Sequence, residues 1–440
     1  MIFSSFAPKS QAQQSSVDWS TQFHHDLARS GYSTSTGSLS NQSLWSYPTG
    51  NSIEYLSPAI INGVVYVASD DDYVYALNAA TGGKIWSYKT GGAVEASPAF
   101  ARGVIYEGSD DHYVYALNAS TGTKIWSYGT GGEVYSSPAI VDGLVYVGSN
   151  DFNVYALNAE TGSKIWSFPT GNYVYSSPAV VNGVVYVDSY LDVYALNASS
   201  GSEIWSYSAG GPMYSTPAVV NGVVYTASNN YVYALSASTG SKIWNYPTGG
   251  IVESSPAVAY GIVYIGSDDK KIYALDVKTG SKMWNFATGN IVDSSPFVAS
   301  GVIYFGSEDR NVYALNSSTG GEIWSCVTGS AVESSPSVAN GVVYIGSDDN
   351  NVYAFGSIVV PQPPPQFPSS SHSSTSASSK HSTSAISNSS ILIIVGAILI
   401  VVVITDLVVG IRLERNYTRK TIDPARKVDL GVEVHELFVP

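Results

Sequence analysis

The dipeptide Ser-Pro, once replaced by Thr-Pro, returns eight times along the middle of the chain at intervals of 39 or 40 residues. A tryptophan returns with the same period, so that two markers stay in phase over eight copies. Such a repeat constrains the fold strongly, because every unit forms the same supersecondary structure and packs against its neighbours. The prolines are Pro58, Pro98, Pro138, Pro178, Pro217, Pro256, Pro296 and Pro336.

Each unit has the pattern of four short β-strands joined by tight turns. In the second unit, apolar stretches at 97–100, 104–106, 113–117 and 124–126 are separated by Gly, Asp and Asn, which favour turns. Four strands in roughly 40–45 residues are typical of one blade of a β-propeller.

The two ends of the repeat are complementary. The last unit stops without its Trp-containing fourth strand, and an unpaired strand at 44–47 precedes the first unit. We therefore predict an all-β, eight-bladed β-propeller over residues 41–357, in which residues 44–47 complete the eighth blade. Closure leaves only short, protected sheet edges. The alternative is an open solenoid, which would need polar caps that the terminal repeats lack.

The stretch Val-Tyr-Ala-Leu-Asn-Ala-x-Thr-Gly-x-Lys-Ile-Trp at 114–126, with near-copies at 74–86 and 154–166, resembles the pyrroloquinoline-quinone-type repeat. That family includes quinoprotein alcohol dehydrogenases and the propeller lipoprotein of the bacterial β-barrel assembly machine. Such a repeat is specific for a fold and says little about function. The resemblance implies that the outer-strand tryptophans dock between neighbouring blades; they are Trp45, Trp86, Trp126, Trp166, Trp205, Trp244, Trp284 and Trp324.

The chain departs from the pattern of the quinone enzymes. These commonly hold their cofactor on the ring axis with two adjacent cysteines, a calcium ion and a catalytic Asp, in a pocket built by long insertions. This repeat has no insertion and one cysteine, Cys326, at a position that is Tyr or Phe in other units. We predict no catalytic residue and no cofactor, and pyrroloquinoline quinone is the disfavoured alternative.

Other chemistry has little support in the sequence. His24-His25-Asp26 resembles a metal cluster, but neighbouring residues of a strand point to opposite faces and no third ligand is identifiable. A serine-based triad has no base, because His112 is the only histidine of the repeat and lies in a turn.

Binding sites in a repeat protein are expected where equivalent positions differ. Two residues before each Ser or Thr of the Ser-Pro motif, where we place the start of the innermost strand, tyrosines and acids form two groups. We expect them to ring one mouth of the central channel as a ligand face, with channel filling as the alternative. The eight residues are Tyr55, Glu95, Tyr135, Tyr175, Tyr214, Glu253, Asp293 and Glu333.

Acidic pairs in the turns between the second and third strands are expected on the same face. Converging carboxylates suit calcium or a cationic partner, and tyrosines suit a sugar or a protein. Capping of tight turns by Asp and Asn is the alternative. The calcium candidates, which are weak, are Asp268, Asp269, Asp348 and Asp349.

The flanking segments predict a membrane-anchored protein. Residues 1–40 are a polar lead-in, or the remnant of a signal peptide whose apolar core is lacking in residues 1–16. Residues 358–390 form a Pro-rich and then Ser/Thr-rich stalk, and Ile391–Ile411 is long enough for a transmembrane helix. Basic residues follow it, so the tail at 412–440 is predicted to be cytoplasmic and the propeller extracellular.

This topology exposes five glycosylation sequons, and three of them lie in equivalent turns opposite the channel mouth, where turn capping is the alternative. They are Asn41, Asn118, Asn197, Asn316 and Asn388. The net charge of −14 argues against nucleic acid as a partner. We expect a single-pass cell-surface protein with a non-enzymatic binding or scaffold propeller for a protein or a glycan. The alternative is a quinone-dependent dehydrogenase.

Overall fold

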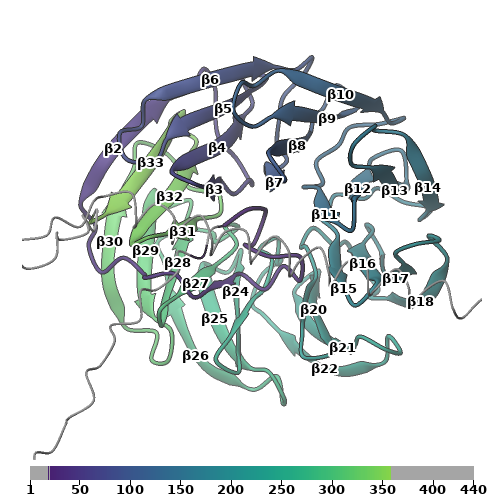
Figure 1. Ribbon diagram of the computed structural model, residues 1–440. Helices are drawn as coiled ribbons and strands as arrows, with labels where there is room; N and C mark the ends of the chain where they lie inside the picture. Colours follow the sequence, from purple (N-terminus) through teal and green to yellow (C-terminus); the bar gives the residue numbers. More distant parts are fainter. Residues whose placement is uncertain (1–17, 19, 358–440) are drawn as a thin grey trace, which may run out of the picture. The chain divides into compact units, whose positions relative to one another are not determined.

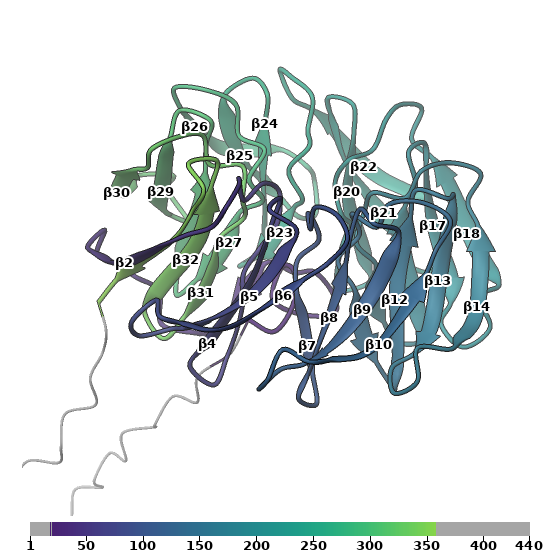
Figure 2. The same ribbon diagram turned by 90° about the horizontal axis from the view of Figure 1, so that it is seen from above.

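The computed structural model describes residues 18 and 20–357, and within them the predicted eight-bladed β-propeller is confirmed (Figure 1, Figure 2). Each blade is a four-stranded antiparallel sheet with a three-residue strand nearest the axis and a Trp-containing strand outermost. The strands of blades one to four are β3 (Ala59–Ile61), β4 (Val64–Ser69), β5 (Tyr73–Asn78), β6 (Lys84–Lys89); β7 (Ala99–Ala101), β8 (Val104–Gly108), β9 (Tyr113–Asn118), β10 (Lys124–Gly129); β11 (Ala139–Val141), β12 (Leu144–Ser149), β13 (Asn153–Asn158), β14 (Lys164–Pro169); and β15 (Ala179–Val181), β16 (Val184–Asp188), β17 (Asp192–Asn197), β18 (Glu203–Ser208).

Blades five to eight repeat this order, and blade eight takes its outer strand from the other end of the chain. The strands are β19 (Ala218–Val220), β20 (Val223–Ser228), β21 (Tyr231–Ser236), β22 (Lys242–Pro247); β23 (Ala257–Ala259), β24 (Ile262–Ser267), β25 (Lys271–Asp276), β26 (Lys282–Ala287); β27 (Phe297–Ala299), β28 (Val302–Gly306), β29 (Asn311–Asn316), β30 (Glu322–Val327); and β31 (Ser337–Ala339), β32 (Val342–Ser347), β33 (Asn351–Gly356), β2 (Ser43–Pro48).

The ring closes as the sequence predicts. Strand β2 pairs antiparallel with β33, and Trp45 lies opposite Ala354. The first and last parts of the repeat therefore share one sheet, and the solenoid alternative is excluded. The hairpins within the blades follow from local sequence, since Asn62 and Gly63 both have positive φ, of 51° and 77°, as a tight two-residue turn requires.

The tryptophans lie between blades. Trp86 Nε1 donates a hydrogen bond to Ala119 O of the next blade at 2.8 Å, and the Tyr66 hydroxyl donates to the same carbonyl oxygen at 3.1 Å. A Cβ atom at Gly122, whose φ is +71°, would approach the Trp86 ring to 2.7 Å. The Thr-Gly turn of one blade and the Trp of the preceding blade thus form one joint, which recurs around the ring.

Residues 20–38, which lie in the predicted lead-in, cross one end of the channel (Figure 1). Their carbonyl oxygens accept hydrogen bonds from backbone N–H groups of the inner strands in blades one, two, four, five, six and seven; the donors are Ile60, Phe100, Val180, Val219, Val258 and Val298. Strand β1 (Tyr32–Ser33) pairs parallel with β27 as a fifth strand of blade seven.

Arg29 anchors this segment on the axis. Its side chain is fully buried and donates hydrogen bonds to the carbonyl oxygens of Phe23, Ser137, Pro138 and Pro178 at 2.7–3.2 Å. Burial lowers the pKa of the guanidinium to about 9. The buried cation is satisfied by backbone oxygens from blades three and four, so the segment is an integral part of the propeller.

His24 and His25 lie in a turn with φ of 51° and 76°, which corrects the strand geometry assumed from the sequence. His24 stacks on Phe23 at a centroid distance of 4.5 Å, whereas His25 Nε2 lies 3.2 Å from an Asp18 carboxylate oxygen. The described residues contain no helix able to span a membrane. The predicted stalk, transmembrane segment, tail and Asn388 lie outside them.

Candidate functional site

One open end of the channel is a cavity of about 440 Å³. The lining includes seven of the eight residues predicted to ring the mouth: Tyr55, Glu95, Tyr135, Tyr175, Tyr214, Glu253 and Asp293. The eighth, Glu333, lies beside Tyr55 and raises the pKa of its hydroxyl, after the larger effect of burial. All eight precede the inner strands, which begin at Ala59 and its equivalents, so they occupy loops and not the strand starts assumed from the sequence.

Tyrosines form one wall of the cavity. The rings of Tyr135 and Tyr175 lie 5.9 Å apart, and those of Tyr175 and Tyr214 lie 6.1 Å apart. Tyr173 stacks on Tyr175 at 5.7 Å and is 43% exposed. Phe152 supports Tyr173 edge-on at 4.9 Å. Sequence reasoning missed Tyr173 and Phe152, although both differ from the residues at equivalent positions in most other blades.

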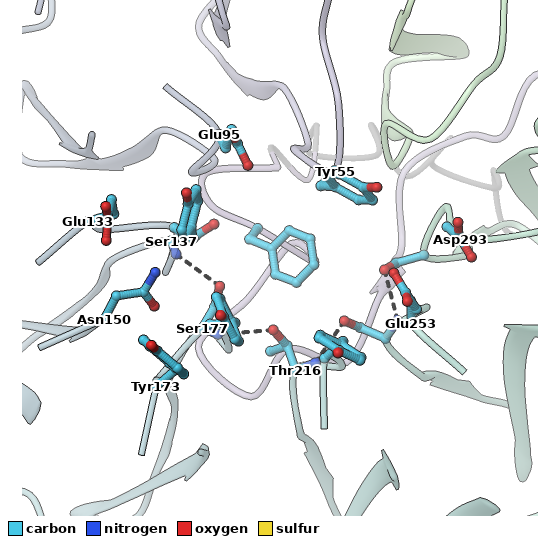
Figure 3. A pocket seen from close by; sticks show the side chains of 16 residues that line it. Tyr55, Glu95, Glu133, Ser137, Asn150, Tyr173, Ser177, Thr216, Glu253 and Asp293 are labelled. Carbon is cyan, nitrogen blue, oxygen red and sulfur yellow. Dashed lines mark hydrogen bonds between the residues drawn. The ribbon is translucent and has the colours of Figure 1, made fainter. Parts of the chain in front are cut away.

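Carboxyl groups occupy much of the rest of the lining, and Figure 3 shows Asp293 and Glu253 across the cavity from Tyr173 and Asn150. Burial and the nearby Asp110 and Asp70 raise the pKa of Glu95 to about 8. Burial and Glu253 raise the pKa of Asp293 to about 9. The protonated form of both carboxyl groups is therefore favoured at neutral pH.

A ring of hydroxyl groups lies below the tyrosines and acids, and it comes from the Ser-Pro motif itself. The Ser177 hydroxyl oxygen accepts a hydrogen bond from Ser137 N at 2.9 Å, and Thr216 Oγ1 accepts one from Ser177 N at 3.0 Å (Figure 3). The same bond joins the other neighbouring blades except at the junction of blades eight and one. The motif thus connects the blades and lines the channel with hydroxyls.

The channel ends at the segment that crosses its far end. Phe23, which is 5% exposed, belongs to the lining together with the hydroxyl ring. Together with Arg29, this segment makes the site a cup with a single mouth.

The two acids of each turn pair have different environments. Asp349 accepts hydrogen bonds from the Tyr353 hydroxyl at 2.7 Å and from Gly329 N at 2.6 Å. Asp269 contacts the Tyr273 hydroxyl and lies 2.8 Å from Lys271 Nζ. These second acids are structural, as the turn-capping alternative supposed.

The first acids of the pairs, Asp268 and Asp348, lie near the mouth acids Asp293 and Glu333, respectively. Burial raises the pKa of both, and the pKa of Asp348 reaches about 7. Within residues 18 and 20–357, however, no three His, Cys, Asp or Glu side chains are arranged to hold a metal ion. The four calcium candidates are therefore not brought together as one ligand set.

The sequons Asn118, Asn197 and Asn316 lie at the turns between third and fourth strands, away from the mouth. Asn118 Oδ1 accepts hydrogen bonds from the backbone N–H groups of Ser120 and Thr121 at 3.0 Å, and the other two asparagines form the same cap. Asn41 Nδ2 donates to Ser325 O at 3.1 Å. Turn capping is thus present, and glycosylation stays a prediction.

The chain matches a known protein family. The family model described as outer membrane protein assembly factor BamB matches residues 4–172, 70–216, 150–290 and 287–357, which together span most of the chain. The chain belongs to this family. No curated protein gives a significant match.

Solved structures share the fold of this BamB-family chain. BamB from Moraxella catarrhalis is 20% identical with a TM-score of 0.63, and the alignment covers 72% of this chain and 99% of that one. Quinohemoprotein alcohol dehydrogenase from Comamonas testosteroni is 17% identical with a TM-score of 0.65, with coverage of 79% and 82%. The computationally designed protein Ika8 is 16% identical with a TM-score of 0.65, with coverage of 72% and 99%. At these identities the likeness concerns the fold alone.

Proposed function

We propose that this protein is a non-enzymatic binding module that takes up its ligand at the channel mouth. The observation that carries the proposal is the exposure of aromatic rings there: Tyr55 is 46% exposed, Tyr173 43% and Tyr214 37%. Side chains that only filled the channel would be buried. A cluster of exposed aromatic rings in a concave site is typical of a binding surface.

Membership of the BamB family, together with the structural likeness to BamB, supports a scaffold function. A propeller presents one rigid face to a partner, and the loops at its mouth vary without disturbing the blades. In this chain the mouth is among the positions that vary between blades, at Tyr175, Glu253 and their equivalents.

The enzyme alternative is poorly matched by the residues present. Pyrroloquinoline quinone is an anion with three carboxyl groups, so its site needs cationic partners. The cavity lining has Glu95, Glu133, Glu253 and Asp293 and contains neither lysine nor arginine. None of these residues supplies the positive charge that a tricarboxylate needs, so the lining does not fit the cofactor. Cys326 lies in the outer strand β30, away from the cavity.

A paired substitution tests the proposal. We expect Tyr175→Ala with Tyr214→Ala to abolish binding to every ligand that the unmodified chain retains on glycan and peptide arrays, because these rings form the aromatic wall of the cavity. The melting temperature should change little. As a control, Tyr146→Ala, which removes a ring that is 2% exposed between blades, should lower the melting temperature and leave the mouth intact.

Two outcomes would contradict the proposal. A large loss of stability in the paired variant would make the tyrosines packing residues. Tight binding of pyrroloquinoline quinone in calorimetry and absorbance titrations, with and without calcium, accompanied by dye-linked alcohol oxidation, would make the protein an enzyme.

The proposal includes display at a cell surface, with Ile391–Ile411 as the membrane anchor, residues 358–390 as the stalk and residues 412–440 in the cytoplasm. Apolar length and the basic residues after position 411 support this topology. A protease site inserted in the stalk tests it. Protease added to intact cells should release the propeller, whereas release only after permeabilisation would place the propeller inside.

A further inference from the structure

We propose that the ligand of the channel mouth is an uncharged saccharide, of which a mono- or disaccharide unit enters the cavity. The inference rests on the proposed function, because it names the ligand class of the same site. The cavity of about 440 Å³ lies within the range of about 300–1,000 Å³ typical of small-molecule sites. A folded partner domain would find no room in it.

The hydroxyl ring offers hydrogen-bond donors to the cavity. Five of its members line the cavity and are 4–5% exposed: Ser137, Ser177, Thr216, Ser255 and Ser295. Each hydroxyl oxygen already accepts a backbone hydrogen bond from the preceding blade. Within the described part of the chain, none of these five hydroxyls donates its own hydrogen to a protein acceptor. Buried donors of this kind require a partner, and water or a ligand in the cavity supplies the acceptor.

The rim of the cavity offers hydrogen-bond acceptors. The carboxyl oxygens of Glu253 and Glu133 are acceptors in the lining of the cavity. A sugar hydroxyl both donates and accepts, so a polyhydroxylated ligand can satisfy the donors of the ring and the acceptors of the rim at once. A simple cation would leave the hydroxyl hydrogens unsatisfied.

The aromatic wall offers an apolar contact surface. Tyr175 and Tyr214 present ring surface on one side of the cavity, and Tyr173 extends it toward solvent. Flat aromatic faces contact the C–H faces of pyranose rings at low entropic cost, because tyrosine has few rotatable bonds. Apolar contact on one side and hydrogen bonds on the others match the two-sided character of a sugar.

The charge of the cavity lining restricts which saccharides can bind. The lining has no lysine or arginine to pair with a carboxylate, so uronic or sialic acids find no cationic partner there. Because Glu95 and Asp293 hold protons at neutral pH, these two carboxyl groups also donate hydrogen bonds and attract cations less than their number suggests. Neutral sugars are therefore favoured over both anions and cations.

The test uses the full-length chain, kept soluble where needed in a detergent without a sugar headgroup. Maltose, cellobiose, lactose and N,N′-diacetylchitobiose are titrated by calorimetry and saturation-transfer NMR, alongside glucuronic acid and an arginine-rich peptide. We expect at least one neutral disaccharide to bind with a Kd in the millimolar range or below, and glucuronic acid to bind at least tenfold more weakly.

A matched pair of variants locates the binding. Ser177→Ala removes a hydroxyl that lines the cavity, whereas Ser97→Ala removes a hydroxyl of the same ring that is not part of the lining. Each variant loses one equivalent backbone hydrogen bond, so their stabilities should fall alike. We expect Ser177→Ala to weaken disaccharide binding at least fivefold and Ser97→Ala to leave it unchanged.

The remaining outcomes separate the two proposals. If only the arginine-rich peptide binds, and Tyr175→Ala with Tyr214→Ala abolishes that binding, the mouth is a binding site but the saccharide inference is wrong. If a sugar binds equally well to the paired variant, the saccharide lies elsewhere and both proposals fail for this cavity. The absence of binding by all of these probes overturns the saccharide inference and leaves the proposed function to the array experiment.

Discussion

Glu107 and Asp188 are acidic residues at positions where the other blades have no charged side chain. Glu107 in β8 is fully buried at a position that is Val, Ile, Phe or Thr in the other blades, and both of its carboxyl oxygens lack a hydrogen-bond partner among the described residues. Asp188 is equally buried but accepts a hydrogen bond from the Thr226 hydroxyl of the next blade. Burial raises the pKa of both carboxyl groups well above the usual range. Only Asp188 therefore has a compensating partner.

Substitution of Glu107 is expected to stabilise the propeller. Glu107→Val places the residue of blades one, three and four in an apolar environment and removes an unsatisfied buried carboxyl group, which costs about 1–3 kcal/mol. Urea unfolding followed by tryptophan fluorescence should show a higher midpoint. The reciprocal change Val147→Glu, at the equivalent position of blade three, should lower it. A lower midpoint for Glu107→Val would mean that this carboxyl group has a partner of its own.

The segment at 20–38 is the element whose position could least be foreseen. It closes the channel with backbone hydrogen bonds to seven blades and supplies Ser38 O, which accepts from Trp324 Nε1 at 3.1 Å and from the Tyr304 hydroxyl at 2.8 Å. In other blades this acceptor is a turn residue of the following blade, as Ala119 is for Trp86. The segment thus completes the joint that blade eight, whose outer strand comes from β2, leaves open.

Arg29→Met tests how much this element contributes. The change leaves the carbonyl oxygens of Ser137, Pro138 and Pro178 without their buried donor, and we expect a loss of about 3 kcal/mol in the free energy of unfolding. Arg310→Met, at an exposed position, is the control and should be neutral. Equal stability of the two variants in denaturant titration would show that the segment is only loosely attached.

The molecule as a whole gathers carboxyl groups around its mouth. Its net charge is −14, and the cavity lining carries carboxyl groups without a lysine or arginine. Burial with mutual repulsion gives Asp348, Glu95 and Asp293 pKa values of about 7, 8 and 9, against 3.8 for Asp and 4.5 for Glu in their ordinary state. A folded state that holds protons which the unfolded state releases is destabilised as the pH rises.

Thermal stability is therefore expected to fall between pH 6.5 and pH 9. In this window the unfolded chain has lost the protons of these carboxyl groups, and the folded protein gives them up only as the pH passes about 7, 8 and 9. His24, whose buried ring has a pKa of about 3, opposes this trend only below pH 6.5. Scanning calorimetry measures the effect, and Glu95→Gln with Asp293→Asn should flatten it. A melting temperature that rises toward pH 9 would contradict the protonation of the mouth.

Much of the fold could be predicted because its determinants are local and repeated. The Ser-Pro and Trp markers define the eight units, the turn residues define four strands in each, and the unpaired strand around Trp45 defines closure. The ring of Tyr175, Glu253 and their equivalents could be predicted from the register of the repeat, because the same position of every unit lies near the channel axis. The contribution of the Ser hydroxyls was missed, since one unit in isolation does not show that its Ser accepts from the preceding blade.

Three properties of the site depend on distant parts of the chain. Phe23 and Arg29 reach the axis only because the segment at 20–38 contacts all eight blades, and no periodic pattern records such contacts. Tyr173 joins the aromatic wall through its position beside Tyr175. The protonation of Asp293 arises from burial and from acids on neighbouring blades, and the energy of that repulsion depends on distances between chain segments. A repeat pattern specifies the number and order of the blades, because these depend on local sequence. The closed end of the channel and the protonation of its carboxyl groups depend on contacts between distant segments, which form only in the folded ring.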